Sequence, residues 1–362
     1  MSALKDFYTK EVLEGFASNI KKAYALFDAK FFVVDIMSDG WDELELKARW
    51  RRITLCLGKH LPMDYKEALD ILYDVVELHD GYTDGFSIVL TDFIEEFGLA
   101  SEHWDISIAA CEHFTKFGTA EGAVRPFIIK DEKRMMAQMH QWAKSDNEHV
   151  RRLASEGCRP ALPWFMALPS FKKDPTPILP ILEELKADPS LYVRKSVANN
   201  INDISKTHPQ LVIDLAKKWY GKDKNTDWIV KHGLRTLLKK GNKDALAIFG
   251  YDDETSIEVS NFDLSTPSVE IGDDINFSFT IASKNATKVR LEYAIDFVKA
   301  NGKRSRKVFK ISEIEMAAGD KRDYTKKHSM ADLSTRKHHA GTHTIAIIVN
   351  GLERVSADFV LS

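Results

Sequence analysis

The 362-residue sequence predicts an α-solenoid of HEAT-like repeats followed by an all-β immunoglobulin-like sandwich. Apolar residues recur at helical spacing up to about residue 250, whereas apolar and polar residues alternate beyond it. The helical part also repeats itself at intervals of about 40 residues, which is typical of stacked helix pairs. We therefore expect a helical domain at residues 1–252 and a β-sandwich domain at residues 262–362.

The composition is that of a soluble globular protein, with 44% hydrophobic and 29% charged residues. The sequence contains no apolar run of about 18 residues, so we expect no transmembrane helix. Its first residues lack the apolar core of a signal peptide. The three cysteines, Cys56, Cys111 and Cys158, are too widely spaced for a metal-ligand pair or a disulfide framework. These features favour a reducing cytoplasm and predict no metal or other cofactor.

Charge is distributed unevenly along the chain, although the net charge is only -3. Residues 1–120 hold 12 basic and 22 acidic residues, whereas residues 121–250 hold 23 basic and 15 acidic ones. Residues 251–362 are almost balanced, with 16 basic and 17 acidic residues. A basic segment within an acidic protein suggests a nucleic-acid partner, and the alternative is a set of solvated helix faces.

The helical pattern is regular and is interrupted by capping and helix-breaking residues. The stretch "DYKEALDILYDVVELH" from Asp64 places apolar residues three and four positions apart. Breaks follow at "DPTP" from Asp174, "ADPS" from Ala187 and "THPQ" from Thr207. Helices joined by such short connections are expected to pack as antiparallel neighbours.

Three similar segments define the repeat. "VRRLASE" begins at Val150, "VRKSVAN" at Val193 and "VKHGLRT" at Val230, so the separations are 43 and 37 residues. Each segment opens with valine and continues with two basic positions. On stacked helices, this repetition predicts a basic stripe along one side of the solenoid.

Helical geometry brings acidic residues to one side of this stack. At 100° per residue, Val193, Val197, Ile201 and Ile204 share a core face, and Asp203 belongs to a polar stripe beside it. The alignment of the repeats puts Glu156 in the place of Asn199, one turn before Asp203. Two carboxylates are therefore expected on the same side of adjacent repeats. Glu121, in the segment "GTAEGAVRPF", is a third candidate, because Pro126 limits that helix.

Each candidate also has a structural interpretation. Glu156 could pair with Arg152 at i,i+4, and Glu121 could pair with Arg125 in the same way. Asp203 could hydrogen-bond a neighbouring loop. Trp164, which follows Pro163, could be a packing residue or the wall of a site for a planar or cationic ligand. Taken singly, each structural interpretation is the more common one, so the functional case depends on convergence of these residues on one basic face.

The C-terminal part alternates apolar and polar residues between Gly and Asn turns. Examples are "SVEIGDDINFSFTIAS", "KVRLEYAIDFVKANG", "SRKVFKISEIEM" and "GTHTIAIIVNGLERVSADFVLS". Several short strands in about 100 residues predict an antiparallel β-sandwich, for which the immunoglobulin fold is one form. This part contains no cysteine pair or tryptophan that would identify the fold.

Long stretches of the helical part resemble the AlkC-type DNA alkylation repair glycosylases, which are HEAT-like proteins related to the AlkD type. The resemblance covers nearly all of the first 240 residues, and the immunoglobulin-like domain fits one branch of the family. At Gly122 and Cys158 the chain departs from the bulkier residue and the threonine expected there. The resemblance is carried by the stretches "WDELELKARWRRI", "FGTAEGAVRPFI", "HVRRLASEGCRPALPW" and "DPTPILPILEELKADPSLYVRKSVANNINDISKTHP".

The resemblance implies a monofunctional glycosylase that excises 3-methyladenine and 3-methylcytosine from alkylated double-stranded DNA and leaves an abasic site. It implies that the active site is lined by Glu121, Glu156, Asp203 and Trp164. It also implies that the base is not turned into an enclosed pocket, whereas most glycosylases do enclose it. It also implies a monomer in the bacterial cytoplasm, associated with the nucleoid when it is bound to DNA.

These residue types suit that chemistry. Cleavage of the glycosidic bond of a methylated base produces an oxocarbenium-like sugar, which carboxylates can stabilise while one of them orients water. Seven basic residues are expected to contact phosphates: Arg125, Arg152, Arg159, Arg194, Lys195, Lys206 and Lys231. The β domain offers two further basic loops, Lys299–Lys307 and Ser334–His339, which could instead be solvated.

Two other functions fit the same pattern. The first is a non-catalytic HEAT-repeat scaffold that binds DNA or protein, because fold alone does not define function. The second is a protein that binds carbohydrates or surfaces through its β-sandwich. The expected lack of a signal peptide disfavours this function. The position of the acidic residues relative to Trp164 within a basic groove discriminates between these alternatives and the glycosylase.

Overall fold

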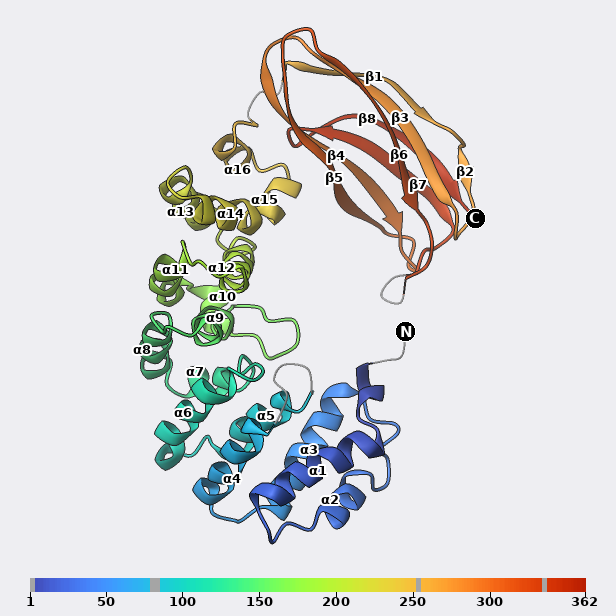
Figure 1. Cartoon of the computed structure of the whole chain (residues 1–362). Coiled ribbons are helices and arrows are strands. Elements are labelled where there is room, and N and C mark those ends of the chain that lie inside the picture. Colours follow the sequence, from blue (N-terminus) through green and yellow to red (C-terminus); the bar gives the residue numbers. More distant parts are fainter. Residues whose placement is uncertain (1–3, 79–84, 252–254, 334–336) are drawn as a thin grey trace. The chain divides into compact units, whose positions relative to one another are not determined.

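The computed structural model describes residues 4–78, 85–251, 255–333 and 337–362 of the chain (Figure 1). The chain divides into two compact units. The first comprises Met1–Thr207 and Gly221–Gly233, and the second comprises His208–Tyr220 and Leu234–Ser362. The helices of the described residues include none that is long and apolar enough to cross a membrane.

The N-terminal half of the first unit consists of helices that pack through apolar faces. The helix predicted in the stretch from Asp64 is confirmed as α4, for which Asp64 is the N-cap and accepts a hydrogen bond from the Glu67 amide at 2.9 Å. Thr9 and Asp28 cap α1 and α2 in the same way. The elements are η1 (Leu4–Phe7), α1 (Lys10–Ala23), α2 (Ala29–Ile36), α3 (Leu46–His60), α4 (Tyr65–Glu77), α5 (Ser87–Phe97), η3 (Ser101–His103) and α6 (Trp104–Phe114).

The C-terminal half of the first unit contains the three repeated segments. They form α9 (Glu148–Glu156), α12 (Leu191–Ile204) and α14 (Lys224–Gly233), and α12 packs against both of the others (Figure 1). A long non-helical segment, which we call the 157–168 loop, separates α9 from α10. The remaining elements are α7 (Val124–Lys130), α8 (Glu132–Trp142), α10 (Pro169–Lys173), η4 (Thr176–Ile178) and α11 (Leu179–Leu185).

The core face predicted for the second repeat is confirmed. Val193, Val197, Ile201 and Ile204 are all buried. The valines that open the three repeats are buried as well. Burial of these aliphatic side chains fixes the rotation of α9, α12 and α14, and it therefore determines where the polar residues between them point.

The first basic residue of a repeat has a structural role. In α9, Arg151 binds Asp188 at 2.6 Å and donates to the carbonyls of Ser145 and Asp146, both at 2.9 Å. In α12, Arg194 donates to the carbonyls of Asp188 and Pro189, both at 2.8 Å. Both arginines thus bind the loop that precedes their own helix. The repeated basic pair is therefore not a continuous surface stripe.

The second unit is dominated by β-strands, and the predicted all-β C-terminal part is confirmed. One sheet has the order β1-β3-β6 and the other has the order β2-β8-β7-β4-β5, with antiparallel pairing except between β2 and β8. The strands are β1 (Ile257–Leu264), β2 (Ser268–Val269), β3 (Asp274–Ser283), β4 (Thr287–Val298), β5 (Arg304–Met316), β6 (Lys321–Ser329), β7 (Gly341–Val349) and β8 (Leu352–Leu361).

A buried apolar cluster joins the two sheets. Phe277 and Phe279 of β3 pack in it together with Ile295 of β4 and Ile345 of β7, and all four are at most 2% exposed. The second unit also includes α13 (Pro209–Trp219), α15 (Arg235–Lys239) and α16 (Lys243–Ile248). β1 begins at Ile257, before the predicted start of the β domain at residue 262, and three helices group with the strands. The domain limits 1–252 and 262–362 stay a prediction.

A tight turn connects β7 to β8 and supports the packing of α16. Asn350 and Gly351 both have positive φ angles, 49° and 80°. This conformation matches the right-handed twist of a hairpin and favours the Asn-Gly pair. The Asn350 side chain accepts from the Arg290 amide at 2.8 Å and donates to the Lys288 carbonyl at 3.1 Å. A Cβ atom at Gly351 would lie 2.6 Å from Leu246 and 2.8 Å from the Cα atom of Gly241.

This close approach predicts different costs for two glycine substitutions. Gly351→Ala should lower the free energy of unfolding of the second unit by about 3 kcal/mol, because strain at positive φ adds to a clash. Gly302→Ala is the matched control. Its φ is also positive, at 74°, but a Cβ atom there meets nothing within 4 Å. The control should cost only about 1 kcal/mol. Urea denaturation measures both values, and equal losses would contradict the packing argument.

Candidate active site

Three carboxylates of the first unit are joined by two arginines into one chain of ion pairs. Arg152 binds Glu121 and lies 3.6 Å from Oε1 of Glu156. Arg159 binds the same oxygen of Glu156 at 2.6 Å and binds Oδ2 of Asp203 at 2.8 Å. The structure therefore brings together Glu121, Glu156 and Asp203, which lie far apart in the sequence.

Each carboxylate is held by a different local structure. Glu156 is the last residue of α9, and Asp203 lies near the end of α12, so the packing of these helices places them together. Glu121 lies in the turn before α7, where Thr119 donates to its Oε2 at 3.0 Å and accepts from its amide at 3.3 Å. Arg152 also donates to Thr119 at 2.9 Å. The guanidinium of Arg152 lies 5.2 Å from the Tyr192 ring centre, which supports it from α12.

Burial makes these ion pairs obligatory. Glu156 and Asp203 are each only 5% exposed, and a buried carboxylate without a cation would carry a large desolvation cost. Burial by itself would lower the pKa of Arg159, but Glu156 and Asp203 outweigh it and raise that pKa. Arg159 therefore stays charged. Lys206 adds a half-exposed cation, 2.9 Å from Oδ1 of Asp203.

Arg125 is not a phosphate contact, so that prediction is wrong. Its side chain is completely buried and donates to three backbone carbonyls: Met166 at 2.5 Å, Gly157 at 2.8 Å and Arg159 at 2.9 Å. Burial lowers its pKa to about 10. The planar guanidinium, with several donors in fixed directions, fits this bundle of carbonyls. Arg125 thus fixes both ends of the 157–168 loop.

The 157–168 loop carries Trp164 and lies against Gly122 and α3. A Cβ atom at Gly122 would clash with the ring of Phe165, so the absence of a bulkier residue there makes room for the loop. The Trp164 ring stacks on Trp50 of α3, with ring centres 6.2 Å apart and an interplanar angle of 24°. Lys47 of α3 donates to the Trp164 carbonyl. Trp164 nevertheless stays 45% exposed.

The other predicted phosphate contacts lie in different environments. Arg194 is directed to the carbonyls before its own helix, which corrects its assignment to a surface stripe. Arg152 and Arg159 lie within the ion-pair chain, with side chains 14% and 10% exposed. Lys195 is exposed, whereas Lys231 is partly buried.

Sequence reasoning missed Thr119, Lys47 and Trp50. Trp50 lies in the stretch "WDELELKARWRRI", but no periodic signal separates it from a packing residue. Its relation to Trp164 depends on contact between segments more than 100 residues apart in sequence. Thr119 lies in the segment "GTAEGAVRPF", where no pattern marks its hydroxyl as a partner of Glu121 and Arg152.

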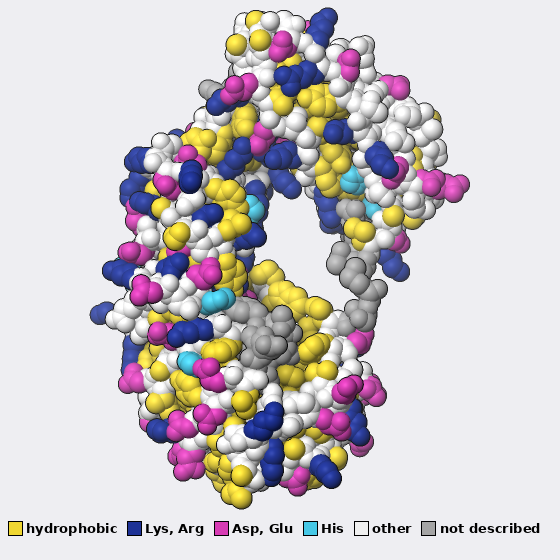
Figure 2. Space-filling view, in the orientation of Figure 1, with side chains coloured by type: hydrophobic (Ala, Val, Ile, Leu, Met, Phe, Trp, Pro, Cys, Tyr) yellow, Lys and Arg dark blue, Asp and Glu magenta, His cyan; other side chains and the backbone are white. Residues whose placement is uncertain are grey.

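The site chemistry of the first unit is that of paired carboxylates. Within the described residues, no group of three or more His, Cys, Asp and Glu has the arrangement of a metal site. Figure 2 shows Asp and Glu gathered over the N-terminal helices, and Lys and Arg more frequent over the middle helices. Such a site can stabilise a cation or orient water, and its neighbourhood can attract an anionic polymer.

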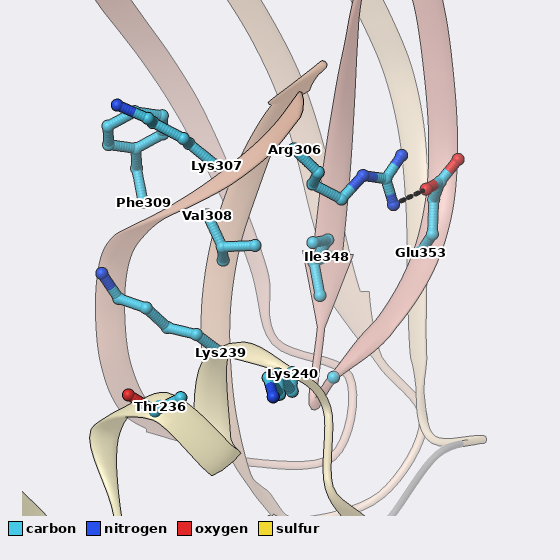
Figure 3. Close-up of a pocket in the computed structure, with 10 residues that line it drawn as sticks. Thr236, Lys239, Lys240, Arg306, Lys307, Val308, Phe309, Ile348 and Glu353 are labelled. Carbon is cyan, nitrogen blue, oxygen red and sulfur yellow. Dashed lines mark hydrogen bonds and ion pairs between the residues drawn. The ribbon is translucent and has the colours of Figure 1, made fainter. Parts of the chain in front are cut away.

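The second unit has a basic cleft of about 620 Å³ between α15 and the sheet that contains β5 (Figure 3). Lys239 and Lys240 of α15 line it together with Lys307, Val308 and Phe309 of β5. Arg306 and Glu353 also line it, and Arg306 is paired with Glu353 at 2.8 Å and with Asp296 at 2.7 Å. The predicted basic loop Lys299–Lys307 thus contributes Lys307 to this cleft. Of the other predicted loop, Ser334–His339, residues 334–336 lie outside the described residues.

Two family models match separate parts of the chain. Residues 82–237 match the model described as DNA alkylation repair enzyme. Residues 258–362 match the C-terminal immunoglobulin-like domain of the uncharacterised protein YhaZ. The uncharacterised protein YhaZ of Bacillus subtilis strain 168 is 48% identical over 359 residues, which covers 99% of both chains.

A solved structure is similar over the whole length of the chain. It is the alkylpurine DNA glycosylase AlkC of Pseudomonas fluorescens, bound to DNA that contains an abasic site analogue. The identity is 38%, the match covers 100% of each chain, and the TM-score is 0.95. With this full-length similarity and the match of residues 82–237, the chain belongs to the AlkC-type family of DNA alkylation repair enzymes.

Proposed function

We propose that this protein is a monofunctional DNA glycosylase that excises cationic N3-methylated bases, 3-methyladenine and 3-methylcytosine, from duplex DNA. The helices α9, α12 and α14 form part of a HEAT-like solenoid in this proposal. The observation that carries it is the chain of three carboxylates on adjacent elements, in a family that includes a solved alkylpurine DNA glycosylase.

In this reaction the protein has to supply negative charge near the sugar and hold the substrate in position. The methylated base carries a positive charge, and it becomes neutral when it leaves with the electrons of the C1′–N bond. The sugar then has oxocarbenium character, which nearby carboxylates stabilise. Water attacks C1′ and loses a proton, so the products are the free base and an abasic site.

The ion pairs suggest different roles for the three acids. Arg152 and Arg159 both bind Oε1 of Glu156, so among the described contacts its Oε2 is the oxygen left to orient water. Asp203 is bound by Lys206, whose side chain is 49% exposed and can move aside when a substrate approaches. Glu121 is held by Thr119 and Arg152 at the other end. Trp164 would exclude water from one side of the lesion.

Duplex binding in this proposal uses lysines around the site and on the second unit. Lys195 lies on α12, the helix that carries Asp203, Lys231 lies on α14, which packs against α12, and Lys206 binds Asp203 itself. Lys239, Lys240 and Lys307 give the cleft of the second unit a positive charge that suits phosphate (Figure 3).

The first prediction concerns the carboxylates. Glu156→Gln and Asp203→Asn should each lower the single-turnover excision rate by about 100-fold, because one preorganised electrostatic partner is removed. Release of 3-methyladenine and 3-methylcytosine from methylated duplex DNA measures the rate. Binding to DNA with an abasic site analogue should change by less than about threefold, since phosphate contacts dominate affinity.

Asp188→Asn is the matched control for this prediction. Asp188 is also a buried carboxylate, 6% exposed, and it pairs with an arginine of α9, Arg151. Its substitution should lower thermal stability while excision by the folded protein remains. Equal losses of excision in all three variants would assign the effect to folding. No release of base by the unsubstituted protein would overturn the enzyme proposal in favour of a non-catalytic DNA-binding scaffold.

The second prediction concerns the product. The chemistry needs no amine nucleophile, so the excised strand should stay intact until alkali cleaves it at the abasic site. Electrophoresis of end-labelled duplex with and without alkali measures this. Strand cleavage without alkali, together with a protein–DNA adduct that borohydride traps by reducing an imine, would contradict the monofunctional assignment.

The third prediction concerns salt. Lys195→Ala should reduce the slope of log affinity against log salt concentration by about one, because one phosphate contact is lost. Lys133→Ala is the control, since Lys133 is an exposed lysine on α8, a helix that packs against α9 but is not one of the three repeated helices. Identical slopes for both variants would exclude Lys195 from the DNA-binding face.

A further inference from the structure

The 157–168 loop is held at its base and at its tip by different parts of the first unit. Arg125 binds the carbonyls of Gly157, Arg159 and Met166 and so closes the base. At the tip, Lys47 of α3 donates to the carbonyl of Trp164. The Trp164 ring itself is contacted by Trp50, one helical turn further along α3.

Trp50 is fixed more rigidly than Trp164. Its indole Nε1–H donates to the Tyr8 hydroxyl at 2.7 Å, and that hydroxyl donates to the Gly85 carbonyl at 2.6 Å. Tyr8 is 3% exposed and packs edge-on against Phe86, with ring centres 5.6 Å apart. Rotation of the Trp50 ring would therefore break its hydrogen bond to Tyr8, a partner that is itself held by the Gly85 carbonyl.

Trp164 lacks this kind of support in its own segment. It lies in a turn of the 157–168 loop, directly after Pro163, and nearly half of its surface is exposed. An exposed aromatic side chain on a loop ordinarily samples several rotamers. The stack on Trp50 and the bond from Lys47 limit this freedom and select one orientation of the indole.

We propose that Trp50 is a positioning residue of the glycosylase site, which acts by holding the indole of Trp164 in the orientation that faces the lesion. The inference rests on the proposed function. It goes beyond that function because it assigns part of the site to α3, outside the repeated helices. A wall displaced by about 1 Å loses much of its effect on the transition state.

Three substitutions test this proposal. Trp50→Ala should lower the single-turnover excision rate by roughly three- to tenfold, the range expected for one aromatic pair. Trp50→Phe should recover most of the rate, because it keeps a ring face for Trp164. Tyr8→Phe should fall between them, because it loosens Trp50 without removing the ring. Affinity for undamaged duplex should stay within about twofold in all three, since no phosphate contact changes.

A spectroscopic measurement reports the geometry without reference to activity. Two stacked indoles give an exciton couplet in the circular dichroism spectrum. Trp50→Ala and Trp164→Ala should each remove the same couplet. Phe31→Ala is the control, because Phe31 is an exposed aromatic residue of α2 that contacts His60 rather than Trp164. This control should change neither the couplet nor excision.

The outcomes separate this inference from the proposed function. An unsubstituted protein that releases no base overturns the glycosylase and the role of Trp50 together. An active protein whose Trp50→Ala variant excises at the full rate overturns only the role of Trp50. If Trp50→Phe is as impaired as Trp50→Ala, ring stacking is not the cause and the proposal is likewise overturned. If Trp50→Ala does not fold, Tyr8→Phe and Trp50→Phe still decide between these outcomes.

Discussion

The arrangement of the first unit depends on the bridge that Arg159 makes between Glu156 and Asp203. The two acids come from different helices, and both are almost fully buried. Two buried negative charges in proximity repel each other and lose hydration, so they can lie together only with a cation between them. Loss of one partner of such a bridge ordinarily costs about 3–5 kcal/mol. This cost ties the end of α9, the start of the 157–168 loop and the end of α12 to one another.

Arg125 extends the same constraint to the loop. Its guanidinium binds carbonyls at residues 157, 159 and 166, so the backbone of Arg159 is held by one arginine while its side chain holds the acids. The loop that carries Trp164 and the residue that organises the carboxylates are therefore positioned by one buried group. This arrangement is a way to hold a site on a loop with the precision of a helix.

Much of the fold follows from local patterns in the sequence. The core faces of the repeats follow from 3.6-residue periodicity, and the apolar spacing in the stretch from Asp64 predicts α4, which Asp64 caps. The convergence of Glu156 and Asp203 followed from alignment of repeats. The charge pattern was less informative, because it could not separate Arg125 and Arg194 from lysines on the surface. Arginine is equally suited to phosphates and to backbone carbonyls, and the sequence does not show which acceptors lie near.

By itself, the sequence determined the succession of helices and strands, the buried faces, the family resemblance and the acids that approach one another. These properties depend on spacing along the chain. Only the tertiary structure decided that Arg125 is buried, that Gly122 makes room for Phe165, and that Trp50 supports Trp164. Those contacts join segments distant in sequence. The packing of α3, α7 and the 157–168 loop brings them together, and no local periodicity records that packing.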